Sequence, residues 1–221
     1  QFNNTEHAAN LFGLKEFGNI YSRLGNPTVG ALEARLTALE EGAMCVALSS
    51  GTSAVMYSLI NIMSQGDNFV TANQLYGGTY TMFDNILPEY GINSKKVDIT
   101  DLEAVEAAID EKTRAIYCET ITNPGLVVAD ISALADIAHS KGIPLIVDAT
   151  FTTSAILKPF EYGADIVVYS LTKWMSGHGR VIAGAVIEKG GFDWGNGNFP
   201  LYDKPDTSYG GMRLSLIHIS E

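Results

Sequence analysis

Residues 142–173, GIPLIVDATFTTSAILKPFEYGADIVVYSLTK, decide the fold. Two short apolar runs rich in Val and Ile, Pro144–Val147 and Ile166–Tyr169, flank a segment at 154–162 that favours a helix. Neither run alternates cleanly between apolar and polar residues, which is typical of strands covered on both faces. The stretch therefore predicts a strand, a crossover helix and a second, parallel strand.

The same alternation extends through most of the chain, from about residue 28. Further apolar runs lie at Met44–Leu48, Phe69–Ala72, Arg114–Cys118 and Val181–Ile187, and further helices are predicted at 28–41, 53–65, 78–88, 101–110 and 130–141. Thr100 and Glu103 have the spacing of a capping box for the helix at 101–110, and the helix at 130–141 begins after Asp130. The pattern predicts an α/β fold with a mainly parallel sheet.

Both ends of the chain depart from this alternation. Residues 1–27 combine Asn, Gly and aromatic residues with little periodicity, so we expect an extended arm. Residues 190–211 are rich in Gly, Pro, Asp and aromatic residues, which predicts an ordered excursion after the last strand of the sheet. Cys45 and Cys118 lie in apolar runs without metal-ligand spacing, which favours buried reduced thiols.

Composition and charge narrow the class of partner. The 221 residues include 14 Lys and Arg against 25 Asp and Glu, a formal net charge of −11. An acidic field repels phosphates, so nucleic acid and anionic membranes are disfavoured as partners. With 46% hydrophobic residues the chain can bury a core. No apolar run approaches the roughly 20 residues of a membrane span, and no signal-peptide pattern is present, so we expect a soluble, cytoplasmic protein.

Polar side chains gather where the predicted strands end. In chain order these groups are Ser49-Ser50-Gly51-Thr52, Gln74-Leu75-Tyr76-Gly77-Gly78, Glu119 with Asn123-Pro124, Asp148-Ala149-Thr150 and Ser170-Leu171-Thr172-Lys173. Ligands of parallel α/β sheets bind at the carboxyl ends of the strands. We therefore expect these residues to meet at one edge of the sheet and to form the functional site.

Together these groups fit one cofactor, pyridoxal phosphate. Ser50-Gly51-Thr52 leads into a helix, so backbone N–H groups and the helix dipole suit a phosphate. Asp148 ends an apolar strand, where a carboxylate needs a cation, and it can hold a pyridine nitrogen protonated. Lys173 can form an imine with the cofactor. Nucleotide sites are disfavoured, because the chain has no GxxxxGK[ST] and no GxGxxG in its first βα turn.

The sequence resembles the Cys/Met-metabolism family of pyridoxal-phosphate-dependent enzymes over residues 2–213. The motifs that carry the resemblance are Tyr21-Ser22-Arg23 with Asn26-Pro27-Thr28, Ser49-Ser50-Gly51, Tyr76-Gly77-Gly78-Thr79, Glu119-Thr120 with Asn123-Pro124, Val147-Asp148 and Ser170-Leu171-Thr172-Lys173. Residues 2–23 and 192–209 are most similar to family members that use O-acetylhomoserine. The resemblance implies the large domain of the type I fold of pyridoxal-phosphate-dependent transferases, with a mainly parallel seven-stranded sheet and helices on both faces.

The resemblance also implies a role for each site residue. Lys173 would bind the cofactor and shuttle protons, Asp148 would pair with its pyridine nitrogen, and Tyr76 would stack on its ring. Asn123 would hydrogen-bond the ring hydroxyl. The residues implied to hold the phosphate are Ser50, Gly51, Thr52, Ser170 and Thr172. No metal site is expected.

Partners and domain organisation are further implications of the resemblance. Residues 1–27 would be an arm whose Tyr21 and Arg23 reach the phosphate of the neighbouring subunit in a dimer or tetramer. Residues 28–213 would form the cofactor-binding domain. Residues 214–221 do not resemble the family's continuation, so we expect an atypical tail and no C-terminal domain in this chain.

The activity implied by the resemblance is a γ-replacement. O-acetylhomoserine and sulfide, or a thiol, would give homocysteine, or methionine, and acetate. Gly78 favours this reaction, because methionine γ-lyases commonly carry Cys at that position. Two alternatives stay open: methionine γ-lyase or cystathionine γ-synthase or γ-lyase activity with the same cofactor contacts, and a truncated chain that binds the cofactor without turnover.

Overall fold

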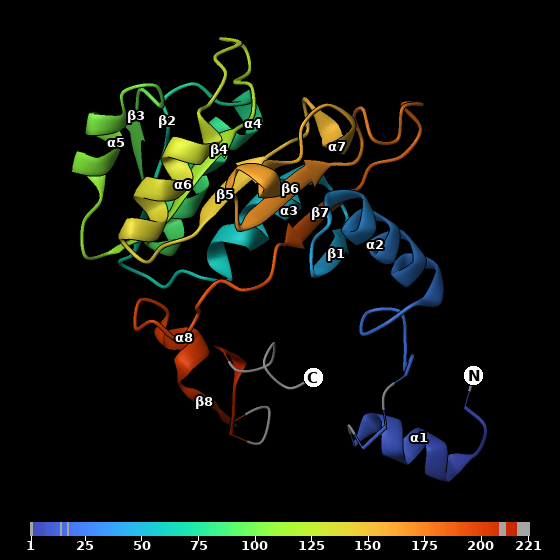
Figure 1. The fold of residues 1–221 in the computed structure, drawn as a ribbon. Coiled ribbons are helices and arrows are strands. Elements are labelled where there is room, and N and C mark those ends of the chain that lie inside the picture. The colour runs from blue at the N-terminus through green and yellow to red at the C-terminus, as the bar shows by residue number, and fades with distance from the viewer. Residues whose placement is uncertain (1, 14, 17, 208–210, 216–221) are drawn as a thin grey trace.

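A seven-stranded sheet forms the centre of the computed structural model, which describes residues 2–13, 15, 16, 18–207 and 211–215 (Figure 1). Its strands are β1 (Met44–Leu48), β2 (Asn68–Ala72), β3 (Asn93–Val97), β4 (Thr113–Glu119), β5 (Leu145–Asp148), β6 (Ile166–Ser170) and β7 (Gly184–Glu188). Their order in the sheet is β1-β7-β6-β5-β4-β2-β3. Only β7 runs antiparallel to its neighbours, β1 and β6, so the predicted mainly parallel sheet is confirmed.

Helices cover both faces of this sheet, as expected. The helices of the sheet region are α2 (Pro27–Glu40), α3 (Gly51–Ile60), α4 (Gly77–Thr81), α5 (Leu102–Ala108), α6 (Ile131–Ser140) and α7 (Thr153–Ile156). α6 packs in front of β4 and β5 in Figure 1, with α5 beside it next to β3, whereas α3 packs behind β6 and β7. The strands between these layers are almost completely buried, with Ile116, Ile146 and Val167 all at 0% exposure.

Strand β3 is absent from the predicted apolar runs. Its sequence, Asn-Ser-Lys-Lys-Val, is polar, and it lies at the edge of the sheet, where β2 is its one partner among the residues that the structure describes. Edge strands are often polar and rich in Lys, since only one side of their backbone is paired. Apolar content alone therefore misses this strand, although the family resemblance implies seven strands.

Strand β7 begins later than predicted. The apolar run starts at Val181, but the ladder begins at Gly184, which pairs with Leu48 on one side and Ser170 on the other. Val181 and Ile182 are 53% and 76% exposed. Their apolar character therefore belongs to the loop before the strand and not to the core.

Two predicted helices divide into shorter segments. The helix expected at 78–88 consists of α4, a π-helical turn at Met82–Ile86 and a 3-10 turn at Leu87–Tyr90. The helix expected at 154–162 ends at Ile156 and resumes as a 3-10 turn at Pro159–Tyr162. Proline lacks a backbone N–H and clashes with the preceding turn, so Pro159 is placed at the start of a new segment.

The expected capping box at Thr100 and Glu103 is wrong. Asp101 is the N-cap of α5, and its carboxylate accepts the Ala104 backbone N–H at 3.0 Å. The Thr100 hydroxyl donates instead to Asp98 at 2.7 Å. Because Asp and Thr are both favourable caps, two adjacent candidates cannot be ranked by residue type alone. The cap predicted before the helix at 130–141 is confirmed, since Asp130 accepts the Ala133 N–H.

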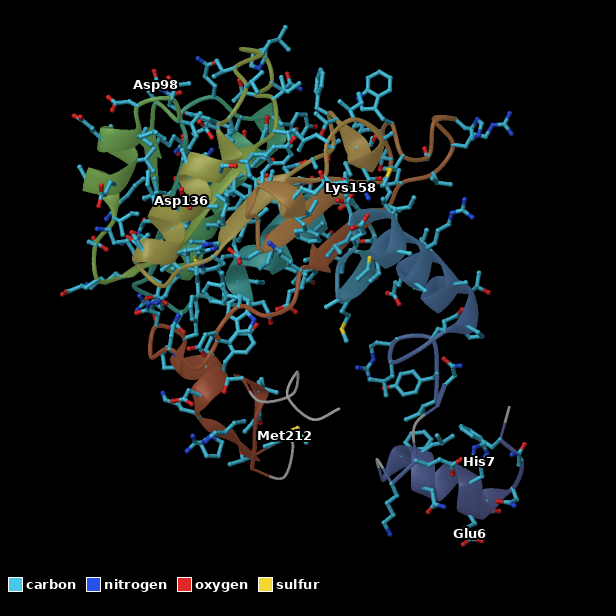
Figure 2. The ribbon with its side chains drawn as sticks, viewed as in Figure 1. Glu6, His7, Asp98, Asp136, Lys158 and Met212 are labelled. Atoms are coloured by element: carbon cyan, nitrogen blue, oxygen red, sulfur yellow. The ribbon has the colours of Figure 1, made fainter. Side chains whose placement is uncertain are left out.

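The N-terminal segment is not extended throughout. It contains helix α1 (Thr5–Phe12). Asn4 is the N-cap of this helix, and its side chain accepts the His7 backbone N–H at 2.8 Å. Figure 1 and Figure 2 show α1 well apart from the sheet. The expectation of an extended segment is therefore wrong for Thr5–Phe12.

The C-terminal excursion is ordered by an aromatic cluster. It contains α8 (Pro200–Asp203), β8 (Pro205–Asp206) and β9 (Met212–Arg213). Trp194 and Phe199 are 5% and 1% exposed, and the Trp194 ring lies 5.0 Å from Phe199 and 5.2 Å from Tyr202. Asn198 ties the excursion to the main body by donating to the Gly142 carbonyl at 3.0 Å. Of the expected tail at 214–221, residues 216–221 lie outside the described residues.

The remaining expectations concern membrane spans, metal sites and the two thiols. Within the described residues, no helix is long and apolar enough to cross a membrane, and no group of three or more His, Cys, Asp and Glu side chains could hold a metal ion. Cys45 in β1 and Cys118 in β4 are buried free thiols, as predicted. Burial raises the pKa of both thiols to about 12, which keeps them protonated at neutral pH.

Candidate active site

A cavity of about 710 Å³ lies at the carboxyl ends of the strands. The predicted site residues that line it come from β1–α3, β2–α4, β4, β5 and β6: Ser50, Gly51, Thr52, Tyr76, Asn123, Asp148, Ser170, Thr172 and Lys173. Strands that are distant in sequence but neighbours in the sheet thus place these residues around one space, as expected for a parallel α/β fold.

One wall of the cavity is the first turn of α3. Ser50 is the N-cap of this helix, and its hydroxyl accepts the Ser53 backbone N–H at 3.0 Å. A Cβ atom added to Gly51 would lie 2.7 Å from Ser170 Cα and 2.9 Å from Ser170 Oγ. Glycine is therefore required for the close approach of α3 to the end of β6. The helix N-terminus, with its free N–H groups, faces the cavity beside the hydroxyls of Thr52 and Ser170.

Lys173 reaches the cavity from the loop between β6 and β7. The loop is held at Thr172, whose hydroxyl accepts the Ala183 N–H at 3.1 Å and donates to the Ala183 carbonyl at 3.2 Å. The Lys173 backbone N–H bonds to the Ser170 carbonyl at 3.1 Å. These contacts fix the backbone of Lys173, whose side chain is exposed on the cavity side.

Asp148 is a partly buried carboxylate at the end of β5. Its Oδ1 accepts the Thr150 N–H at 2.9 Å, and its Oδ2 accepts the Tyr117 hydroxyl at 3.3 Å. Burial raises the pKa of Asp148 despite these two donors. A cationic group in the cavity would offset this cost of burying the negative charge. Thr150 also accepts the Ser170 N–H at 2.7 Å, so the ends of β5 and β6 are joined at the cavity.

Tyr76 and Asn123 lie in the loops after β2 and β4. The Tyr76 ring is 48% exposed and lies against Gly78, where an added Cβ would be 2.7 Å from the ring. The loops meet at Glu119, which is 6% exposed and also lines the cavity. Sequence reasoning included Glu119 in a motif but gave it no role. Its position at the end of an apolar strand, like that of Asp148, was the available signal.

Glu119 is the second acidic group of the cavity. Burial first, and then the neighbouring Asp148 carboxylate, raise the pKa of Glu119 to about 7. The two residues are register partners on the adjacent strands β4 and β5. Two carboxylates therefore face one cavity. A ligand that carries positive charge or hydrogen-bond donors is favoured there.

Tyr21 and Arg23 do not line this cavity. They lie in the segment between α1 and α2, where the Arg23 guanidinium bonds to the Tyr21 hydroxyl and lies 4.9 Å from the centre of its ring. Tyr21 is 41% exposed. Figure 1 shows this segment between α1 and the N-terminal end of α2. Within one chain, the structure therefore does not bring the pair to the predicted phosphate position.

A family model described as Cys/Met metabolism PLP-dependent enzyme matches residues 1–204. This chain belongs to that family. The match spans the sheet, the cavity and the N-terminal segment. The family resemblance proposed from the motifs is confirmed.

Individual members of this family are identical to this chain at nearly half of the aligned residues. It is 47% identical over 213 residues to the O-acetyl-L-homoserine sulfhydrylase of Leptospira meyeri, covering 96% of this chain and 48% of the relative. It is 48% identical over 216 residues to O-acetyl-L-homoserine sulfhydrylase 1 of Thermus thermophilus, covering 97% of this chain and 51% of the relative. The chain thus spans about half the length of these curated relatives.

A solved structure extends the family likeness to the fold. A Campylobacter jejuni protein assigned as an O-acetylhomoserine (thiol)-lyase superposes with a TM-score of 0.93 at 39% identity, over 100% of this chain and 57% of that protein. The structure of that protein contains an N′-pyridoxyl-lysine-5′-monophosphate. The expected type I fold is confirmed by this match.

The residues around the cavity fit pyridoxal phosphate, the cofactor of the family. The cavity presents an amine on Lys173, a carboxylate on Asp148 whose burial calls for a cation, and the N-terminus of α3. These are the partners that the aldehyde, the ring nitrogen and the phosphate of the cofactor require.

Proposed function

We propose that this protein catalyses a γ-replacement in which O-acetylhomoserine and sulfide, or a thiol, give homocysteine, or methionine, and acetate. The observation that carries the proposal is the convergence of Lys173, Asp148 and the N-terminus of α3 on one cavity. The chain that forms this cavity is 47% identical over 213 residues to an O-acetyl-L-homoserine sulfhydrylase. The activity is that of a transferase.

The bound cofactor would supply an electrophilic carbonyl and a ring that accepts electron density from the amino acid. Lys173 would bind that carbonyl through its amine and then carry a proton between Cα and the neighbouring carbons of the substrate. Asp148 would keep the ring nitrogen protonated, since its buried carboxylate is stabilised by a facing positive charge. The C–O bond to acetate breaks at Cγ, and a C–S bond to sulfide forms there.

The remaining residues would hold the cofactor in place. Tyr76 would cover the face of the ring, and Asn123 would bond to the ring hydroxyl. The phosphate would be held by the first turn of α3 and by the side chains and backbone of Ser50, Gly51, Thr52, Ser170 and Thr172. All these residues line the same cavity, which supports this assignment.

Self-association is part of the same proposal. Tyr21 and Arg23 would contribute to the phosphate site of the neighbouring subunit in a dimer or tetramer. The pair does not line the cavity of its own chain, which supports this arrangement. We further propose that residues 1–27 act as the arm, that residues 28–213 form the cofactor-binding domain, and that the enzyme works in the cytoplasm.

Replacing Lys173 by Ala tests the assignment. Lys173→Ala should remove the visible absorbance of the lysine-bound cofactor and lower acetate release from O-acetylhomoserine with sulfide by at least about 1000-fold, because one amine both binds the cofactor and carries protons. Lys112→Ala is the control, since Lys112 is exposed and outside the cavity. A Lys173→Ala variant that keeps both properties would contradict the assignment.

The substrate is tested separately on the wild-type protein. Acetate and homocysteine should form from O-acetylhomoserine and sulfide, with little 2-oxobutyrate formed from methionine. Predominant 2-oxobutyrate formation would instead identify a γ-lyase. A visible cofactor band without turnover of either substrate would identify a chain that binds the cofactor only.

A further inference from the structure

Glu119 connects two loops that the proposed function places on the cofactor. Its Oε1 accepts the Tyr76 backbone N–H at 2.7 Å, and its Oε2 accepts the Asn123 backbone N–H at 3.0 Å. One carboxylate therefore uses both oxygens on main-chain donors from two different loops. Tyr76 follows β2 and Asn123 follows β4, so the connection spans neighbouring strands.

These two hydrogen bonds act where other restraints are weak. Tyr76 is the N-cap of α4, and its side chain makes no cap hydrogen bond. Its ring is half exposed, so packing alone does not fix its position. Hydrogen bonds between a charged acceptor and backbone N–H groups are among the stronger ones in proteins. Glu119 is therefore well suited to hold the backbone from which the Tyr76 ring projects.

A buried carboxylate is an expensive way to achieve a purely structural link. Glu119 is 6% exposed and lies beside Asp148, its register partner, which raises the cost of its charge. A neutral side chain could not replace it, because only a carboxylate offers two acceptor oxygens and no donor. The cost of burying this carboxylate is justified where the positions of both loops determine how a ligand between them is held.

We propose that Glu119 is a positioning residue that holds Tyr76 and Asn123 at the spacing required to bind the cofactor ring. It acts through the two backbone N–H groups and does not itself take part in the reaction. The proposal rests on the proposed function only in taking pyridoxal phosphate as the group bound in the cavity.

The test compares Glu119→Gln with Glu33→Gln. Glu119→Gln keeps one acceptor oxygen but points an NH₂ group at one of the two backbone N–H groups. One of the two hydrogen bonds is therefore lost. Glu33 is the matched control: its Oε1 accepts the Ala47 N–H at 2.8 Å, and it does not line the cavity. Each apoprotein is titrated with pyridoxal phosphate, and the circular dichroism of the bound cofactor and the thermal unfolding of the apoprotein are recorded.

We expect Glu119→Gln to raise the dissociation constant for pyridoxal phosphate about ten-fold and to weaken the circular dichroism band that reports ring orientation. Glu33→Gln should leave both cofactor readings unchanged, because its remaining acceptor oxygen can still accept the Ala47 N–H. Wild-type cofactor readings in Glu119→Gln would overturn the proposal, and so would equal cofactor effects in both variants.

Amide hydrogen exchange of the wild-type apoprotein supplies a test that needs neither a folded variant nor the cofactor. The N–H groups of Tyr76 and Asn123 should exchange slowly, and unprotected exchange at both would overturn the proposal. The proposed function fails separately, if wild type binds pyridoxal phosphate but releases no acetate from O-acetylhomoserine. A wild-type protein that does not bind pyridoxal phosphate overturns both.

Discussion

Gly184 begins β7 at a point where three segments meet. A Cβ atom added there would lie 2.5 Å from the Ser50 carbonyl carbon and 2.9 Å from the Gly51 nitrogen, and still closer to the Ser50 carbonyl oxygen. All three atoms are backbone, so none can rotate away. The residue that lets β7 enter the sheet is therefore also the one that lets the first turn of α3 sit beside it.

Gly184→Ala should lower the free energy of unfolding by about 3 kcal/mol, because overpacking against backbone cannot be relieved by a side-chain rotation. The matched change is Gly30→Ala in α2, where an added Cβ meets nothing within 4 Å. Alanine there should stabilise the protein by up to about 1 kcal/mol through helix propensity. Urea unfolding measures both, and equal effects at the two positions would contradict the geometry.

At the scale of elements, Asp110 ties the polar edge strand to the sheet. It lies between α5 and β4 and accepts from Lys95 of β3 at 2.6 Å, from Asn68 of β2 at 3.0 Å and from Thr113 of β4 at 3.1 Å. The ammonium of Lys95, followed by the Asn68 amide, holds the pKa of Asp110 well below its usual range. The carboxylate thus compensates for the few apolar contacts that β3 can make.

Asp110→Asn should lower the urea midpoint at pH 7 by the equivalent of about 1 kcal/mol, a figure reduced for solvent screening because the side chain is 48% exposed. A depressed folded-state pKa contributes stability above the unfolded value of 3.8, and the contribution is lost as the pH falls through the folded value. The difference in urea midpoint between Asp110→Asn and wild type should therefore become smaller below pH 4. Glu111→Gln, at the exposed neighbouring residue, should show no such difference.

The same edge shows which elements sequence can predict. The buried strands β4, β5 and β6 are continuous apolar runs, since both of their faces are covered, and their positions follow within a residue or two. Strand β3 depends on pairing with β2 and on the Lys95–Asp110 contact, neither of which leaves an apolar pattern. The α5 cap was misplaced by one residue because Thr100 and Asp101 are both good caps.

For the site, sequence predicted which residues gather around the cavity better than it predicted the hydrogen bonds between them. Residues at strand ends, such as Asp148 and Lys173, can be placed together because parallel strands share one edge. Glu119 and Tyr117 act through hydrogen bonds to other site residues, and these depend on side-chain direction and on loop paths. No local pattern encodes such geometry, so their contacts with Tyr76 and Asp148 emerge only in three dimensions.

At the scale of the whole molecule, the separation of the arm from the cavity gives a test of subunit exchange. Under the proposed arrangement, in which the arm of one subunit completes the site of the other, Arg23→Ala and Lys173→Ala should each be inactive alone, because each removes one part of every site. Random pairing of the two variants in dimers should restore up to about a quarter of the wild-type sites, each with Lys173 from one subunit and Arg23 from the other. Acetate release after co-refolding measures the recovery.

A second mixture controls this experiment. Lys173 and Asp148 line the cavity of one chain, so mixing Lys173→Ala with Asp148→Asn should restore no complete site. No recovery in the first mixture would show that the arm serves the site of its own subunit. Recovery in the second mixture would show that one site takes Lys173 and Asp148 from different chains.

The position of β7 between β1 and β6 also sets the order in which the chain can fold during synthesis. β1 leaves the ribosome before every other strand of its sheet, yet within the described part of the chain it pairs only with β7, the last of these strands. The parallel strands β2 to β6 can pair as they emerge, whereas β1 and α2 must wait with unpaired backbone. Such distant pairing is slow and exposes strand edges to other chains. The phosphate side of the cavity, which follows β1, is thus completed after its ring side, and a nascent chain stalled before residue 184 should be prone to aggregation and unable to hold the cofactor.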